Sequence, residues 1–444
     1  MDRKLFAGCG RGDITPAPGG HIYGYTDNEF STGIHDNLDA KALALSDGTE
    51  RPLILVSLSV CELGTPFAME VQQPVADACG TTPDRVLLSC IHTHAAPNVA
   101  GLGNLWGCRD KPYFDEIFVP GIVAAAKEAV ANMVPAEYAI VKGQSEIGVN
   151  RRERKLDGTV KLGQNPWGAQ DKDLIVLRFR NRDTREGIFQ MVYYGCHGTA
   201  AGHAQLISRD WAGIMLDRME ERHGMMTALW TGSIGDIGPR ISNGKTIGDI
   251  HIMEELGGFA AQEGIRIAKQ FKDAVYECGL PVFKPLPLEF DVRPMPPVEE
   301  VEAFLAAHPE GEIKKKADAL EFLYMQRCRE RYEKGEKLPA KRTVTGAIVT
   351  LGDSAAFCFT PFELFSETTL MLRKHSPFRN TMGVSVTNGF EKYLPTQTEQ
   401  VRGGYEVYNY KFAELPLPEN ADFLLLNMFL DALKELHTPC ETAV

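Results

Sequence analysis

Short apolar runs rich in β-branched residues recur along the whole chain, separated by stretches with the periodicity of amphipathic helices. Apolar residues at three- and four-residue spacing in Tyr113–Met133, Trp211–Gly224 and Gly257–Phe271 predict helices there. Strands that alternate with helices over the full length are typical of a layered α/β architecture. We therefore predict an α/β fold with a mixed β-sheet core, flanking helices and an active site at the strand ends. The predicted strands lie in Pro52–Val60, Arg85–Ile91, Asp173–Phe179, Ile188–Cys196, Met226–Ser233, Gly346–Pro361 and Asn380–Gly389.

Two segments depart from this alternation. The N-terminal stretch Met1–Pro16 reads as turn-rich and lacks the apolar core of a signal peptide. The proline-rich stretch Lys284–Pro297 leads into a highly charged region at about 298–340 with apolar residues at helical spacing. We predict two helices there, either as a lid or side arm or as a solvated hairpin packed on the sheet. Because the strand pattern then resumes, we predict a single catalytic domain over 1–444 with a charged helical insertion.

The composition is that of a folded globular protein, with 44% hydrophobic and 24% charged residues. A net charge of −12 argues against nucleic acid as a partner, because binding phosphates requires a basic surface. No run approaches the roughly 20 apolar residues of a membrane span, so we expect a cytoplasmic protein without stable membrane association. The expected partner is a small-molecule substrate, and a homo-oligomer is compatible with the sequence. The 10 cysteines are scattered without a CxxC pair, which disfavours a disulfide framework or a thiolate zinc cluster.

Polar residues directly follow several predicted strands, where open α/β sheets place their sites. VLLSCIHTHAAPN carries His92 and His94, which as residues i and i+2 of a strand would point to the same face. His197 follows another strand, and Glu363 stands between a strand and a helix. Two imidazoles and a carboxylate from different strand ends are typical of a catalytic zinc site with an open position. On the residues alone, the alternative stays open that these are hydrogen-bonded core histidines and a first-turn carboxylate.

A series of motifs resembles, in order, the catalytic domain of the neutral and alkaline, non-lysosomal ceramidases, a family of zinc-dependent amide hydrolases. The resemblance covers nearly the whole chain and implies the fold of that domain and one Zn²⁺ per chain. The motifs are AGCGRGDITP, GIHDNLDAKALAL, LLSCIHTHAAP, GVNRRE, CHGTA, SRDWAG, GSIGDIGP, TPFELF and TNGFEKYLPT followed by GGYE. The zinc ligands that it implies are His92 in IHTH, His197 in CHGT, Glu363 in TPFELF and Tyr393 in NGFEKY.

The resemblance also implies roles for three further residues. His94 matches a histidine beside the reacting carbonyl, Arg151 in VNRRE matches an active-site arginine, and Tyr405 in GGYE matches a second active-site tyrosine. The implied reaction is attack of a zinc-bound water on an amide, lactam or ester carbonyl. His94 would pass a proton to the leaving amine, Tyr405 would donate to the oxyanion, and Arg151 would hold the intermediate or an anionic substrate group.

The chain departs from the secreted ceramidases in ways that bear on the substrate. It shows neither a signal peptide nor a C-terminal immunoglobulin-like domain, and Gly238 stands where those enzymes have a serine once taken for a nucleophile. We therefore expect hydrolysis of a small soluble substrate. The alternatives are a true ceramidase acting on N-acyl sphingoid lipids, and an inactive carbohydrate- or lipid-binding protein of the same fold.

Two other enzyme classes fit the sequence less well. A cysteine hydrolase would use Cys196, but the adjacent His197 would face the other way on a strand. A phosphoryl-transfer enzyme would use glycine-rich turns such as GSIGDIGP, but no P-loop lysine follows them. Whatever the substrate, we expect Gly101–Phe114 and Pro239–Glu255 to wall the pocket.

Overall fold

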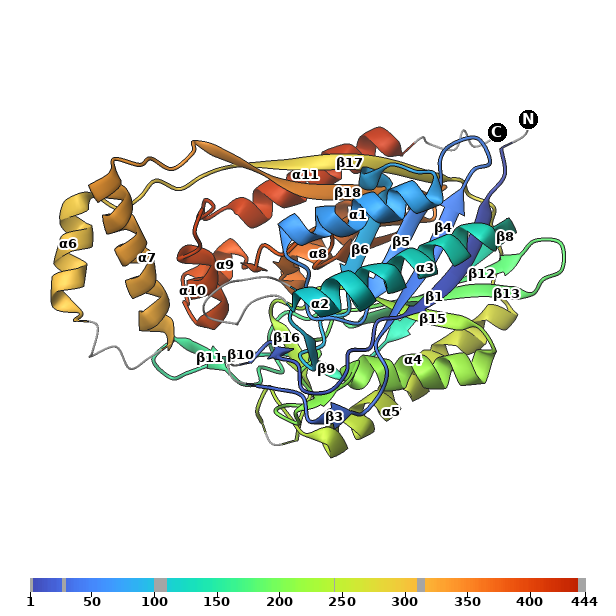
Figure 1. Cartoon of the computed structure of the whole chain (residues 1–444), viewed down its shortest axis with the longest axis horizontal. Helices are drawn as coiled ribbons and strands as arrows, with labels where there is room; N and C mark the ends of the chain where they lie inside the picture. The colour runs from blue at the N-terminus through green and yellow to red at the C-terminus, as the bar shows by residue number, and fades with distance from the viewer. Residues whose placement is uncertain (1–2, 26–28, 100–109, 243, 310–315, 438–444) are drawn as a thin grey trace.

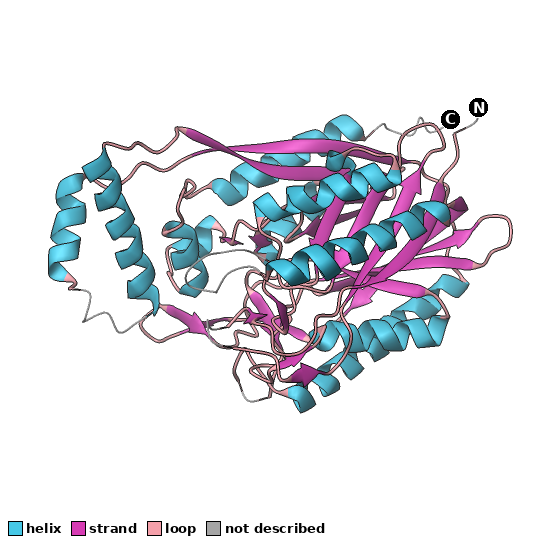
Figure 2. Cartoon of the chain, in the orientation of Figure 1, coloured by secondary structure: helices cyan, strands magenta, loops and turns pink. Residues whose placement is uncertain are grey.

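Two β-sheets pack face to face, and helices cover the outer face of each (Figures 1 and 2). The computed structural model describes residues 3–25, 29–99, 110–242, 244–309 and 316–437. The larger sheet is mixed, because β13 pairs with β15 and β5 with β6 in parallel, whereas the other neighbours are antiparallel. Its strands, in spatial order, are β15 (Met226–Thr231), β13 (Gly187–Tyr194), β12 (Asp173–Asn181), β8 (Val134–Gln144), β1 (Phe6–Asp13), β4 (Asp39–Ser46), β5 (Leu53–Leu58) and β6 (Val86–Cys90).

Helices cover one face of this larger sheet in two groups. The first group, α1 and α3, packs over β1, β4, β5 and β6, and the second, α4 and α5, packs over β8, β12, β13 and β15. Alternate side chains of the same strands point to the opposite face, as the two-residue period of a strand requires. The helices are α1 (Thr65–Cys79), α3 (Val119–Ala131), α4 (Asp210–His223) and α5 (Ile250–Ala268).

Glycines in β1 allow α3 to lie very close to the sheet. A Cβ at Gly8, Gly10 or Gly12 would come within 2.3, 2.2 and 1.9 Å, respectively, of a carbonyl oxygen of α3. The N-terminal segment, expected to be turn-rich, is therefore largely a central strand. Its glycines mark the close approach of another backbone rather than a turn.

The second sheet packs its inner face on the larger one. Val349 and Phe357 share a core there with Leu177 and Trp230 of the larger sheet. The outer face packs on α8 (Ser366–His375) and α11 (Ala421–Leu436). The run Gly346–Pro361, predicted as one strand, contains the turn between two of its strands. In spatial order the strands are β17 (Pro281–Asp291), β18 (Lys341–Leu351), β19 (Ala355–Phe359) and β21 (Asn380–Val384).

The charged region at about 298–340 forms α6 (Val298–Ala307) and α7 (Lys316–Lys334), between β17 and β18. The two helices lie at the left of Figure 1, beyond the ends of both sheets. α7 contacts α10 (Tyr405–Lys411), and Arg327 Nη2 donates a hydrogen bond to Phe412 O at 2.9 Å. The insertion therefore contacts the segment that carries Tyr405.

Short elements shape the loops around the strand ends. β9 (Gly148–Asn150) pairs with β16 (Ile237–Pro239), and β20 (Glu363–Leu364) pairs with β22 (Tyr393–Leu394). Within the described ranges, no helix combines the length and apolarity needed to cross a bilayer. The other short elements are β2 (Ile22–Tyr23), β3 (Gly33–Ile34), η1 (Pro83–Arg85), β7 (Ala96–Pro97), α2 (Lys111–Tyr113), η2 (Phe114–Phe118), β10 (Arg152–Arg154), β11 (Val160–Leu162), β14 (Leu206–Ile207), η3 (Lys269–Lys272) and α9 (Gln397–Gln400).

Candidate metal centre

His92 and His94 lie in the turn after β6 rather than on the strand. β6 ends at Cys90, and His92 has a left-handed backbone with a φ of +64°. The predicted reason for their proximity, a shared strand face, is therefore wrong, because the strand alternation stops before them. The turn itself brings the two rings together, with centroids 5.1 Å apart and Nε2 atoms 3.5 Å apart. Such a backbone costs about 1–3 kcal/mol, and residues of this kind cluster at functional sites.

His197 reaches the same place from the loop after β13. The two loops run so close together that a Cβ at Gly198 would lie 2.6 Å from His92 O. His94 N donates to Gly198 O at 2.9 Å, and Trp211 Nε1 donates to His197 O at 3.0 Å. The glycine of CHGT and the tryptophan of SRDWAG thus hold His197 against His92, with the two Nε2 atoms 3.1 Å apart.

A backbone carbonyl fixes the other nitrogen of each of these two rings. His92 Nδ1 lies 2.9 Å from Cys61 O, and His197 Nδ1 lies 2.7 Å from Ile234 O. Because a carbonyl oxygen can only accept, each Nδ1 carries the hydrogen and each Nε2 carries a lone pair. Two buried lone pairs therefore face each other across the short distance between the rings.

Glu363 adds a carboxylate oxygen to the pair. Its Oε2 lies 3.4 Å from His197 Nε2 and 3.7 Å from His92 Nε2, and this buried atom has no hydrogen-bond partner among the described residues. Burial raises the pKa of Glu363 to about 8, although Arg151 and a hydrogen bond from Tyr393 oppose the rise. The parallel pairing of β20 with β22 sets Glu363 directly beside Tyr393. Burial also lowers the pKa of His92 to about 3.

These atoms fit a divalent cation. His92, His197 and Glu363 each offer one ligand atom, all within 4.8 Å of one another. Two imidazoles and one carboxylate form a typical donor set for Zn²⁺, and an outer hydrogen bond from Nδ1 to a carbonyl is usual for a metal-bound histidine. A cation would satisfy the unpartnered carboxylate oxygen and turn the repulsion of the facing lone pairs into attraction.

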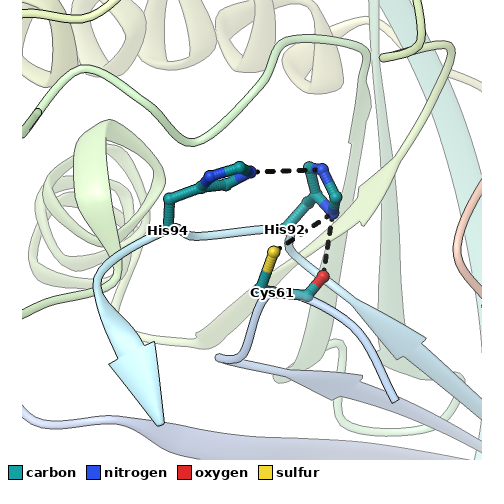
Figure 3. A group of neighbouring side chains, drawn as sticks. All are labelled: Cys61, His92 and His94. Atoms are coloured by element: carbon teal, nitrogen blue, oxygen red, sulfur yellow. Dashed lines mark hydrogen bonds between the residues drawn. The ribbon is translucent and has the colours of Figure 1, made fainter. Parts of the chain in front are cut away.

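A second group of side chains, Cys61, His92 and His94, also meets the distance condition for a metal. Figure 3 shows that His92 turns Nδ1 toward Cys61 and Nε2 toward His94. Since Nδ1 already donates its hydrogen to Cys61 O, that nitrogen cannot share a metal with the sulfur. Burial also raises the pKa of the Cys61 thiol well above its ordinary value, which disfavours the thiolate that a metal requires. The group that contains Glu363 is therefore the better candidate.

Arg151 lies beside the cluster and is tied to the segment of Tyr405 through Glu406. Arg151 Nε donates to Glu406 Oε1 at 2.8 Å, and Arg152 Nη1 donates to Glu406 Oε2 at 2.7 Å. The Arg151 guanidinium lies 5.4 Å from the ring centroid of Tyr393, whose ring is 5.7 Å from that of Tyr405. Arg151 Nη2 is buried and has no hydrogen-bond partner in the described part of the chain. One cationic donor is therefore left unsatisfied next to the cluster.

The family model of the N-terminal domain of neutral/alkaline non-lysosomal ceramidases matches residues 6–250. The chain belongs to this ceramidase family. A solved structure described as a ceramidase complexed with C2 matches with a TM-score of 0.74 and 17% identity, covering 100% of this chain and 77% of the other. The neutral ceramidase from Pseudomonas aeruginosa matches with a TM-score of 0.73 and 17% identity, covering 100% and 76%. No curated protein matches the sequence significantly. Family membership supports an enzyme that hydrolyses amide bonds.

The site of this ceramidase family member includes Gly24 and Tyr25, which the sequence did not single out, and Asp236, which it indicated in a turn after a predicted strand. The ring of Tyr25 lies 5.1 Å from that of His94, and Gly24 lies so close that its Cβ would be 2.4 Å from His94 Nδ1. Asp236 accepts hydrogen bonds from Ser366 N at 2.8 Å and from Asn150 Nδ2 at 3.2 Å, which braces the loops around the cluster. Of Gly24, Tyr25 and Asp236, only Asp236 had a signal in the sequence, because it lies in the motif GSIGDIGP.

Two expectations about neighbouring segments have different outcomes. Cys196 makes no pair with the imidazole of His197, since its Sγ lies 3.6 Å from His197 O and burial raises the thiol pKa well above its ordinary value. Cys196 therefore has no imidazole base in His197. Most of the first predicted pocket wall, Gly101–Phe114, lies outside the described residues, which omit 100–109. The second wall, Pro239–Glu255, stays a prediction.

Proposed function

We propose that this ceramidase family member is a zinc-dependent hydrolase that cleaves an amide, lactam or ester bond in a small soluble substrate. The observation that carries the proposal is the convergence of two carbonyl-anchored imidazoles and an unpartnered, buried carboxylate oxygen at 3.1 to 3.7 Å from one another. His92, His197 and Glu363 would hold the zinc, with Tyr393 as the fourth protein ligand. A bound zinc would supply a Lewis acid that polarises the carbonyl and lowers the pKa of a water to about 7.

His94 is assigned the proton transfer. Burial, together with the charges of His92 and Arg151, lowers the pKa of His94 well below its ordinary value, so the ring is neutral at pH 7. A neutral imidazole can accept a proton and then deliver it to the leaving amine. Gly24 and Tyr25 pack against the ring and fix its position.

Arg151 and Tyr405 are assigned to the oxygen atoms of the substrate. Glu406 accepts a hydrogen bond from Nε of Arg151 through one carboxylate oxygen. The buried Nη2 of Arg151 is then available to an acceptor on the substrate or on the tetrahedral intermediate. The ring of Tyr405 lies 5.7 Å from that of Tyr393, and Tyr405 would donate its hydroxyl hydrogen to the developing oxyanion. A free guanidinium donor favours a polar, oxygen-rich substrate over a wholly apolar one.

The test is a comparison of substrates on protein of known zinc content. We expect purified protein with about one zinc per chain to hydrolyse short N-acyl amino acids or lactams faster than N-acyl sphingoid lipids in mixed micelles. Faster turnover of the sphingoid lipids would favour the true ceramidase instead. A fully folded protein that takes up zinc but turns over neither class would favour the inactive binding protein.

A further inference from the structure

A cavity with a basic lining lies at the end of the larger sheet opposite the metal cluster. It measures about 580 Å³ and is bounded by β12, the start of β13, the end of α4, and η3 after α5. Gly187 at the first position of β13 borders it, whereas His197 lies beyond the last position of the same strand. At about 3.3 Å per residue, this strand separates the cavity from the metal cluster by roughly 25 Å. In Figure 1 the turn between β12 and β13 projects at the right.

The charged residues that line this cavity are positive. None of the described lining residues is an aspartate or glutamate, and His223 adds a titratable ring to the cationic groups. Among the described residues, the carboxylate that forms ion pairs with this lining is Glu137, which pairs with both Arg180 and Arg185. The cationic lining side chains are Arg178, Arg180, Arg185, Arg222, Lys269 and Lys272.

The other cations of the cavity lack a carboxylate partner. Arg222, Lys269 and Lys272 make no ion pair with any residue that the structure describes. The buried Nε of Arg178 has no hydrogen-bond partner in that same part of the chain, while Nη2 donates to the side-chain oxygen of Gln190 at 3.1 Å and the guanidinium also hydrogen-bonds to Tyr276. The chain as a whole carries a net charge of −12, so this concentration of positive charge does not follow from the overall composition. Gathering several like charges around the single counter-charge of Glu137 costs free energy that an anionic ligand would recover.

Aromatic rings hold the two central arginines in place. The Arg178 guanidinium lies 4.2 Å from the centroid of Phe271, and that of Arg180 lies 3.3 Å from the centroid of Tyr276. Burial lowers the pKa of Arg178, and burial with the charges of Arg178 and Arg222 lowers the pKa of His223 to about 4. Burial is the largest cause of both shifts, and the neighbouring positive charges add to it.

We propose that this basic cavity binds a soluble phosphorylated molecule of about nucleotide size, at a site separate from the hydrolase centre. Guanidinium forks bind phosphate oxygens in pairs, and mobile lysines at the rim add point charges. The volume of about 580 Å³ exceeds what one inorganic phosphate fills and falls within the range of small-molecule sites.

The experiment measures binding of ATP and of inorganic triphosphate to the full chain by calorimetry at low salt. We expect saturable binding that weakens as salt rises, because the contacts are ionic. The double variant Lys269→Glu with Lys272→Glu should weaken binding about tenfold or more, since both exposed side chains border the cavity. The matched control reverses two exposed lysines elsewhere, Lys127→Glu with Lys337→Glu, and should bind as the unchanged chain does.

Two results would overturn the proposal. One is equal ATP affinity in the cavity variant and in the control variant. The other is binding to phosphatidylglycerol vesicles, lost in the cavity variant, without any binding of ATP or triphosphate, because that would assign the cavity to a lipid headgroup. A supporting signature is a rise in the pKa of His223 on adding ATP, followed by NMR of its ring protons.

Discussion

His92 and His197 meet with their Nε2 atoms 3.1 Å apart, while a backbone carbonyl holds the Nδ1 of each. Neither ring can turn its hydrogen inward without losing that carbonyl bond. A cation placed between the rings would be attracted by both lone pairs, and the carboxylate of Glu363 would add a negative charge beside it.

Removing either kind of ligand should remove the metal. We expect His92→Ala and Glu363→Ala to contain less than about a tenth of the zinc found in the unchanged chain, measured by elemental analysis after gel filtration. His375→Ala, at the exposed end of α8, is the matched control and should keep its zinc. Full zinc content in His92→Ala would contradict the assigned ligand set.

His94 should separate metal binding from turnover. His94→Ala is expected to keep its zinc, because the other two imidazoles and Glu363 remain, but to lower kcat roughly 100- to 10,000-fold through loss of proton transfer. The measurement is zinc content and kcat on the same preparation. Near-normal kcat in this variant would refute the role of His94.

Glu406 should prove structurally essential. Glu406→Gln removes the carboxylate that both Arg151 and Arg152 contact, so buried Arg151 loses its ion pair and Arg152 keeps only its ion pair with Glu399. We expect the free energy of unfolding to fall by about 3–5 kcal/mol, seen as a lower Tm. Glu414→Gln is the control, because its side chain is 77% exposed and its ion pair with Arg331 lies at the surface. Equal Tm values for the two variants would contradict this assignment.

The close approach of β1 and α3 predicts sensitivity to a single methyl group. Gly10→Ala would place a Cβ 2.2 Å from Ala125 O, so the helix must move, and we expect a loss of about 1–3 kcal/mol in the free energy of unfolding. Gly20→Ala is the matched control, since its Cβ would meet nothing nearer than 3.7 Å. Denaturant unfolding measures both variants, and an unaffected Gly10→Ala would show that the helix can shift freely.

Two histidines should give opposite contributions to the pH dependence of stability. The folded-state pKa of His223 is lowered to about 4, so the unfolded chain takes up a proton first and the contribution of His223 to stability falls as pH drops from about 6.5 to 4. For His35, burial lowers the pKa, but bonds to Asp36 and Glu254 outweigh it and raise the pKa, so its contribution is lost as pH rises. His223→Gln should therefore reduce acid sensitivity, and His35→Gln should increase it, in Tm measured from pH 4 to 8.

The alternation of apolar runs and helical patterns was sufficient to predict the mixed sheet and its flanking helices, but not the second sheet. An apolar run such as that of β19 indicates a strand without indicating which sheet it joins. The sequence did not predict β1, because Gly8, Gly10 and Gly12 have a weak strand preference. The tertiary contact with α3 overrides that preference.

Strand-end positions were sufficient to name His92, His197 and Glu363 as candidates, but only the family motifs assigned separate roles to the site residues, since their proximity depends on loops far apart in the chain. The structure brings His92, His197 and Glu363 together, with Tyr393 beside them, whereas their roles stay predictions. The left-handed backbone of His92 had no sequence signal, because positive φ is rare outside glycine.

The two sheets contribute different candidate ligands to the cluster. His92 and His197 follow β6 and β13 of the larger sheet, whereas Glu363 follows β19 of the second sheet, and Tyr393 comes after β21. An ion bound by all of them would link the two sheets. The affinity for the ion would then be thermodynamically coupled to the packing of one sheet on the other. Zinc would then bind tightly only to a chain in which both sheets have formed. A chain with only the larger sheet formed would offer the two imidazole nitrogens but not the carboxylate of Glu363.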